Sequence, residues 1–78
     1  MKSDAKLHEA LTLLEQGDWQ KAHAIVQQHD TQDAAWLHGI VHVLEGDLDN
    51  ARYWYERAKR TFSADVKSEL AAARQTLV

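Results

Sequence analysis

Two histidines four positions apart occupy the most apolar stretch of this 78-residue chain, and a glutamate follows them within one helical turn. Residues 34–44 read AAWLHGIVHVL, in which His38 and His42 are the polar side chains, and Glu45 follows directly. Side chains four positions apart project from one helix face, a spacing that suits a divalent ion such as Zn²⁺. HGIVH departs from the zinc-protease pattern HExxH, because Gly39 stands where that pattern has its glutamate. His38, His42 and Glu45 are therefore candidate metal ligands without a protease signature.

Three interpretations of this stripe stay open at the level of sequence. In the first, His38 and His42 are partly buried and hydrogen-bond to Glu45, Asn50 or a backbone carbonyl, as buried polar groups generally do. In the second, they line a pocket for a small ligand or a partner. In the third, they bind a divalent metal ion. No other cofactor is indicated.

A third histidine lies on the preceding helix. Trp19 and His23 are one helical turn apart, at the margin of that helix's apolar face. If this helix packs antiparallel to the one that carries His38 and His42, three histidines, a glutamate and a tryptophan would line one cleft. The alternative is that His23 is an exposed residue beside the apolar face.

Other kinds of active site find little support. The chain has no cysteine, which excludes disulfides, thiolate metal sites and thiol nucleophiles. Three glycines form no phosphate-binding loop, and the carboxylates Glu45, Asp47 and Asp49 are accounted for by a turn and a helix cap. No residue set nominates an enzyme.

Charge and hydropathy argue against nucleic acid and membrane partners. Residues 1–50 carry three Lys and nine Asp or Glu, whereas residues 51–78 carry six Lys or Arg and three Asp or Glu. The net charge of −3 and the lack of a continuous basic stripe disfavour nucleic-acid binding. The first residues lack the apolar run of a signal peptide, and no later stretch reaches the length of a membrane span. We expect a cytoplasmic protein.

Helical periodicity and turn residues divide the chain into five short helices and leave no strand signal. The first is expected at about residues 4–16 and ends at Gly17, after which Asp18 caps the second. A polar break over residues 29–33 follows. The third helix runs over 34–45 with Asp33 as its cap, and the fourth opens at Asp47 or Asp49. The last covers about 63–77 with Ser63 as its cap. The expected inward residues are Leu7, Ala10, Leu11, Leu14, Ala22, Ile25, Val26, Leu37, Ile40, Val41, Leu44, Ala51, Trp54, Tyr55, Ala58, Phe62, Val66, Leu70, Ala73 and Leu77.

An internal repeat connects the first four helices. The segment GDWQKA, which starts at Gly17, is matched by GDLDNA from Gly46, at an offset of 29 residues. The same offset places Ala10 on Gly39, so each unit has a small residue seven positions before its glycine. Each unit is expected to be a helical hairpin in which a small residue lets the two helices approach closely.

This pattern resembles tetratricopeptide repeats and their shorter relatives over about residues 3–60. The resemblance implies stacked helical hairpins closed by an additional helix, and binding of a protein or peptide in the groove of the first helices. The spacing of 29 differs from the 34 residues of that family, and the proline that ends its units is absent. The block HGIVHVLEGDLDNARYWYERA also resembles small bacterial proteins of unestablished function, a likeness that suggests no activity.

Together, these features predict a single all-α domain over residues 1–78. It comprises tetratricopeptide-like units at about 4–29 and 33–60 and a capping helix at about 63–77. The expected function is protein or peptide binding; the alternative is a small-ligand or metal-binding protein, conceivably an enzyme, built on the histidines. Tyr53 is expected to point outward near two arginines, which makes a homodimer a further hypothesis. The candidate binding residues are Trp19, His23, His38, His42, Glu45, Asn50 and Tyr53.

Overall fold

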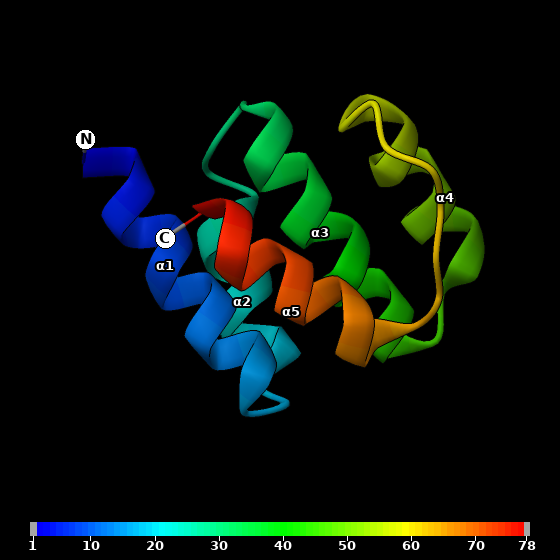
Figure 1. The fold of residues 1–78 in the computed structure, drawn as a ribbon, viewed down its shortest axis with the longest axis horizontal. Helices are drawn as coiled ribbons and strands as arrows, with labels where there is room; N and C mark the ends of the chain where they lie inside the picture. The colour runs from blue at the N-terminus through cyan, green and yellow to red at the C-terminus, as the bar shows by residue number, and fades with distance from the viewer. Residues whose placement is uncertain (1, 78) are drawn as a thin grey trace.

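Five helices follow one another along the chain, separated by short turns and one longer connection at residues 58–65. The computed structural model describes residues 2–77, with side chains from residue 5 onward, and it contains no strand in that range. The helices are α1 (Lys2–Glu15), α2 (Trp19–Val26), α3 (Gln32–Glu45), α4 (Leu48–Arg57) and α5 (Val66–Leu77) (Figure 1). None of these helices combines the length and the apolar character needed to cross a membrane.

The two glycine–aspartate turns have the same geometry. Gly17 and Gly46 adopt positive φ angles of 82° and 92°, a region open to glycine because it has no Cβ. The following Asp18 and Asp47 each accept a hydrogen bond from the backbone N–H three residues later, at 3.2 and 3.3 Å. The predicted turns are confirmed, and Asp47 rather than Asp49 caps α4.

Two predicted caps are wrong. Thr31, not Asp33, caps α3: its extended backbone aims Oγ1 at the N–H of Ala34, 3.1 Å away. Asp33 lies in the first turn of the helix. At α5, the Ser63 hydroxyl accepts from the N–H of Asp65, and the Asp65 carboxylate in turn accepts from a backbone N–H of the helix. Ser63 therefore shapes the approach to α5, and Asp65 caps it.

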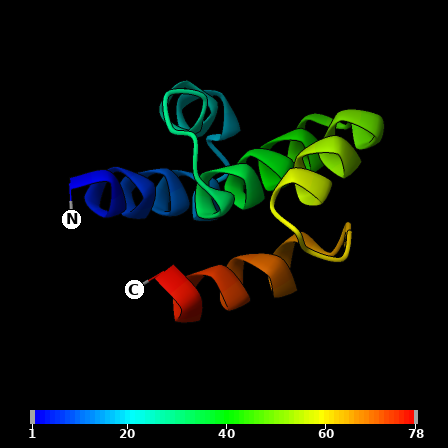
Figure 2. The same cartoon turned by 90° about the horizontal axis from the view of Figure 1, so that it is seen from above.

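Helix α3 is the centre of the molecule. It packs strongly against α4 and also contacts α1, α2 and α5, while α1 packs strongly against α2. Figure 2 shows α2 and α5 on opposite sides of α1 and α3. Every residue from Ala34 to His42 is buried, because each side of this helix faces a neighbour. Such burial fits a helix that is apolar almost all round.

The core consists mainly of the residues that helical spacing had turned inward. Small residues mark the closest helix contacts: Ala10, Ala22 and Ala51 are fully buried, and a Cβ added to Gly39 would lie 2.5 Å from Tyr55 Cδ1. Of the expected inward residues, Ile25, Leu44, Trp54, Phe62, Val66, Leu70 and Leu77 are only partly buried and pack against this core from its edge.

Side-chain hydrogen bonds from its first and last turns fix helix α5 to the rest of the domain. Glu69 Oε1 accepts hydrogen bonds from Trp36 Nε1 of α3 at 3.0 Å and from the Tyr55 hydroxyl of α4 at 2.6 Å. Burial, together with the hydrogen bond to Glu69, raises the pKa of the Tyr55 phenol well above its ordinary value. At the other end, the Arg74 guanidinium donates two hydrogen bonds to the Glu15 carboxylate of α1 in a bidentate ion pair. These bonds hold α5 across α1 and α3.

Candidate metal centre

Three histidines from two helices come together at one place. The ring centroids of His23 and His38 are 4.8 Å apart, those of His23 and His42 are 5.5 Å apart, and those of His38 and His42 are 5.1 Å apart. One ring nitrogen from each lies within 4.8 Å of the corresponding nitrogen of the other two. We call His23, His38 and His42 the histidine cluster.

Helix geometry accounts for this arrangement. His38 and His42 are one turn apart on α3, so their rings stack with an interplanar angle of 18°. His23 comes from α2, which packs against α3, and its ring meets the other two edge-on at 79° and 71°. The sequence left open whether His23 would reach the stripe or be an exposed neighbour; in the structure it lies in the cluster.

Glu45 is held against the cluster through His42. Its Oε1 lies 2.8 Å from His42 Nδ1, and the carboxylate is partly exposed whereas the His42 ring is largely buried. An ionised carboxylate only accepts hydrogen bonds, so Nδ1 is the donor in this pair, and the bond does not involve Nε2. For His42, the structure therefore contains the hydrogen bond to Glu45 that the first interpretation expects, and this bond uses one ring nitrogen only.

Trp54 of α4 covers one side of the cluster. Its ring stacks on the His38 ring with centroids 3.8 Å apart and an interplanar angle of 9°. The Arg57 guanidinium lies 5.5 Å from the centre of the Trp54 ring on the same helix. Helical spacing predicts that Trp54 faces the core, but it does not predict this contact. No spacing rule relates a position on α4 to one on α3.

The environment of His38 favours the neutral imidazole. His38 is 5% exposed and His42 is 8% exposed. Burial, followed by repulsion from His23 and His42, lowers the pKa of His38 from 6.5 to about 4. A metal ion binds the neutral imidazole, so His38 loses no proton to become a ligand near pH 7.

No protein-family model, curated protein or solved structure matches this chain. The chemistry of the site is therefore argued from its donor atoms. Zinc–nitrogen bonds of about 2.0–2.1 Å in a tetrahedral site place ligand nitrogens about 3.3 Å apart. The nitrogens of the histidine cluster lie within 4.8 Å of one another. Each would reach the zinc arrangement by moving about 1 Å toward the centre of the cluster as its ring rotates.

The other candidate residues occupy different surroundings. Trp19 packs against the core, and no ring contact joins it to the histidine cluster. The Asn50 side chain donates to Asp47 at 3.1 Å and so belongs to the cap of α4. Tyr53 is 50% exposed on the outer side of α4, where Arg57 Nη1 lies 3.5 Å from its hydroxyl. Helix α5 leaves this tyrosine uncovered.

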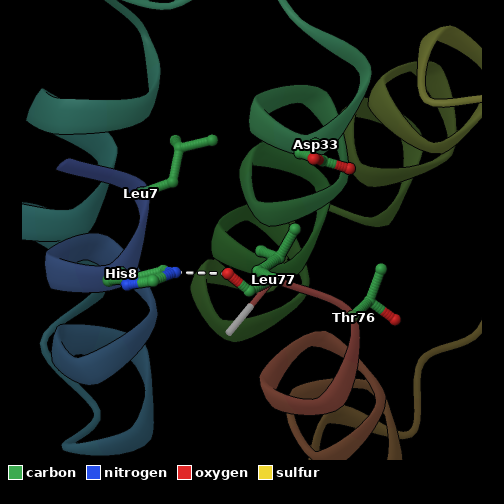
Figure 3. A pocket seen from close by; sticks show the side chains of 5 residues that line it. All are labelled: Leu7, His8, Asp33, Thr76 and Leu77. Carbon is green, nitrogen blue, oxygen red and sulfur yellow. Dashed lines mark hydrogen bonds between the residues drawn. The ribbon is translucent and has the colours of Figure 1, made fainter. Parts of the chain in front are cut away.

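Two hollows lie away from the histidine cluster. A cavity of about 110 Å³ is bounded by Leu7, His8, Asp33, Thr76 and Leu77, and the His8 ring nitrogen there bonds to the Leu77 carbonyl (Figure 3). A wider groove of about 460 Å³ lies beside α4 and is lined by Asp49, Arg52, Tyr53, Tyr55, Glu56, Arg60 and Phe62. The first is too small for more than a few water-sized molecules, and the second is a shallow surface of mixed charge.

Proposed function

We propose that this protein binds one divalent transition-metal ion through His23, His38 and His42. The observation that carries the proposal is the approach of three ring nitrogens, one from each side chain, to within 4.8 Å of one another. Two of them project from one turn of α3, and the third comes from a different helix. An ion held this way would link α2 to α3.

The donor set decides the class of ion. Imidazole nitrogen suits Zn²⁺, Cu²⁺, Ni²⁺ and Co²⁺, whereas Ca²⁺ and Mg²⁺ prefer carboxylate, carbonyl and water oxygens. The His38 ring is neutral near pH 7, and the hydrogen bond to Glu45 holds His42 with Nε2 available. Both features favour binding of an ion such as Zn²⁺ at physiological pH.

Calorimetric titration with Zn²⁺, Ni²⁺ and Co²⁺, together with thermal unfolding, tests the proposal. Binding at one equivalent should stabilise the fold by about 2.7 kcal/mol when the free ion is 100 times its dissociation constant. His38→Gln and His42→Gln should abolish this gain and His23→Gln should reduce it. The matched control is His29→Gln, since His29 lies outside the cluster and should leave binding unchanged. Binding that persists in all three cluster variants would refute the proposal.

A second candidate function is protein or peptide binding by a tetratricopeptide-like module. The matching turns of the two hairpins and their common offset support a repeat relation between residues 4–29 and 33–60. Helix α5 lies across α1 and α3, and we take the outer side of α4 as the surface for a partner. There Tyr53 is 50% exposed and Leu48 is 40% exposed, beside the groove of about 460 Å³.

Affinity capture with wild-type protein and Tyr53→Ala tests this second candidate. A partner that uses α4 should be retained by the wild type and lost by the variant, while both proteins keep the same helical content. Sedimentation at tens of micromolar checks in parallel whether the partner is a second copy of the chain. Equal capture by both proteins would exclude the outer side of α4 as the binding surface.

A further inference from the structure

We propose that the ion in the histidine cluster has only three protein ligands and keeps one coordination position for an exchangeable ligand, water or a small anion. Glu45 then acts as a positioning residue for His42 and not as a ligand. This inference rests on the proposed metal binding and deepens it, because an ion with an open position can bind or activate a small molecule.

The state of Glu45 is the first step of the argument. The sequence had suggested Glu45 as a ligand beside His38 and His42, but its carboxylate is engaged with His42 Nδ1 at 2.8 Å. A histidine ligand commonly donates its second ring N–H to a carboxylate, which fixes the ring and makes the ligating nitrogen more basic. The Glu45–His42 pair has that arrangement, with Nε2 left for the ion.

The state of Asp47 is the second step. The donors of His42, Glu45 and Asp47 also lie within 4.8 Å of one another. Asp47, however, accepts from the backbone N–H and the side-chain amide of Asn50, at 3.3 and 3.1 Å. An ion at this second group would compete with the cap of α4 and with the Glu45–His42 bond for the carboxylate oxygens, and both carboxylates are exposed to water. The histidine cluster requires neither loss.

In the part of the chain that the structure describes, no fourth His, Asp or Glu side chain joins the histidine cluster. Trp54 presents the face of its indole to His38, and Arg57 beyond it is a cation. Within the described residues, the groups of three or more potential ligands near these histidines are the cluster itself and the group of His42, Glu45 and Asp47. Three nitrogens therefore leave a tetrahedral ion one position short, which solvent or a small anion fills.

Access to that position is available at the rim of the site. His23 is only half-buried, and the Glu45 side chain is 39% exposed. The covered side of the cluster is the one on which Trp54 stacks. A small anion can therefore approach the ion past His23 and Glu45, at the rim of the site.

Spectroscopy of the Co²⁺-loaded protein tests this inference, with azide as the probe anion. We expect azide to shift the visible absorption of the bound Co²⁺ at one azide per ion, because it replaces the exchangeable ligand. Glu45→Ala should retain the azide response and weaken Co²⁺ binding about 10-fold or more, the usual effect of losing a carboxylate behind a histidine ligand. Glu56→Ala, which removes an exposed carboxylate beside the groove on α4, is the matched control and should change neither.

The outcomes separate this inference from the proposed function. If the wild-type protein binds no Co²⁺, the proposed function fails and this inference fails with it. If Co²⁺ binds but azide leaves the spectrum unchanged, the site is coordinatively complete and only this inference is overturned. A changed Co²⁺ spectrum without azide in both Glu45→Ala and Glu45→Gln would identify Glu45 as a direct ligand and would overturn it as well.

Discussion

Replacing Gly39 by alanine should destabilise the fold, although alanine is the better helix former. Gly39 lies in the middle of α3 and packs against Ala51 and Tyr55 of α4. A Cβ at this position would lie 2.5 Å from Tyr55 Cδ1, 2.8 Å from Tyr55 Cε1 and 3.3 Å from the Ala51 carbonyl oxygen. Favourable carbon–carbon contacts are about 3.5–4.0 Å, so the tyrosine ring would have to move by about 1 Å.

The magnitude follows from what holds that ring in place. Tyr55 is 1% exposed, and its hydroxyl donates to Glu69 at 2.6 Å, so a shift strains both the packing and a charged hydrogen bond. Overpacking a core costs about 1–3 kcal/mol, and because the charged hydrogen bond to Glu69 resists the shift of the ring, we place this site at about 2–3 kcal/mol. The higher helix propensity of alanine returns about 1 kcal/mol. We expect Gly39→Ala to lower the free energy of unfolding by about 1–2 kcal/mol.

Thermal and urea unfolding of the variant measure this effect. For a domain of this size, a loss of about 1–2 kcal/mol lowers Tm by about 4–16 °C. In a Tyr55→Leu background, the smaller and more mobile side chain can turn away, so Gly39→Ala should lose most of its cost. A Tm that rises in the otherwise wild-type protein, as helix propensity alone would dictate, would refute the close approach of α3 and α4.

Three further predictions concern stability. His38 takes up a proton near pH 4 in the folded protein but near pH 6.5 in the unfolded chain. The free energy of unfolding should therefore decrease as the pH is lowered from 6.5 to 4, by at most about 1.4 kcal/mol per pH unit. Urea titrations at pH 7 and 5 should show a smaller decrease in the free energy of unfolding for His38→Gln than for the wild-type protein. Thr31→Ala should cost about 1 kcal/mol as a lost cap, and Asp33→Ala less than half of that; equal losses would contradict the assigned cap of α3. Glu69→Ala leaves the Tyr55 hydroxyl and a buried indole N–H without their acceptor and should cost about 2 kcal/mol or more by urea unfolding.

Helix boundaries and turns were largely predictable because neighbouring residues determine them. Gly17 and Gly46 permit a left-handed backbone, and the aspartates that follow satisfy the first N–H groups of the next helix. The cap of α3 was harder to predict, since Thr31 and Asp33 are both good cap residues and only Gln32 lies between them. The extended backbone at Thr31 decides between them, and sequence spacing does not encode it.

The candidate site was predictable only within one helix. The i, i+4 spacing of His38 and His42 put both rings on one face, and the hydrogen bond to Glu45 follows from the same helix. The approach of His23 depends on where α2 crosses α3, and the stacking of Trp54 depends on how α4 lies against α3. These relations are set by packing between helices, including the space left by Gly39, and they have no local signature.

The most direct test of the metal centre is to follow the ring nitrogens of all five histidines by ¹⁵N NMR during a Zn²⁺ titration. Metal binding through the histidine cluster predicts that one ring nitrogen each of His23, His38 and His42 shifts together and saturates at one equivalent. For His42 the shifted nitrogen should be Nε2, with Nδ1 still protonated toward Glu45, and the resonances of His8 and His29 should stay in place. Unchanged cluster nitrogens at several equivalents of Zn²⁺, or shifts confined to His8 and His29, would contradict it.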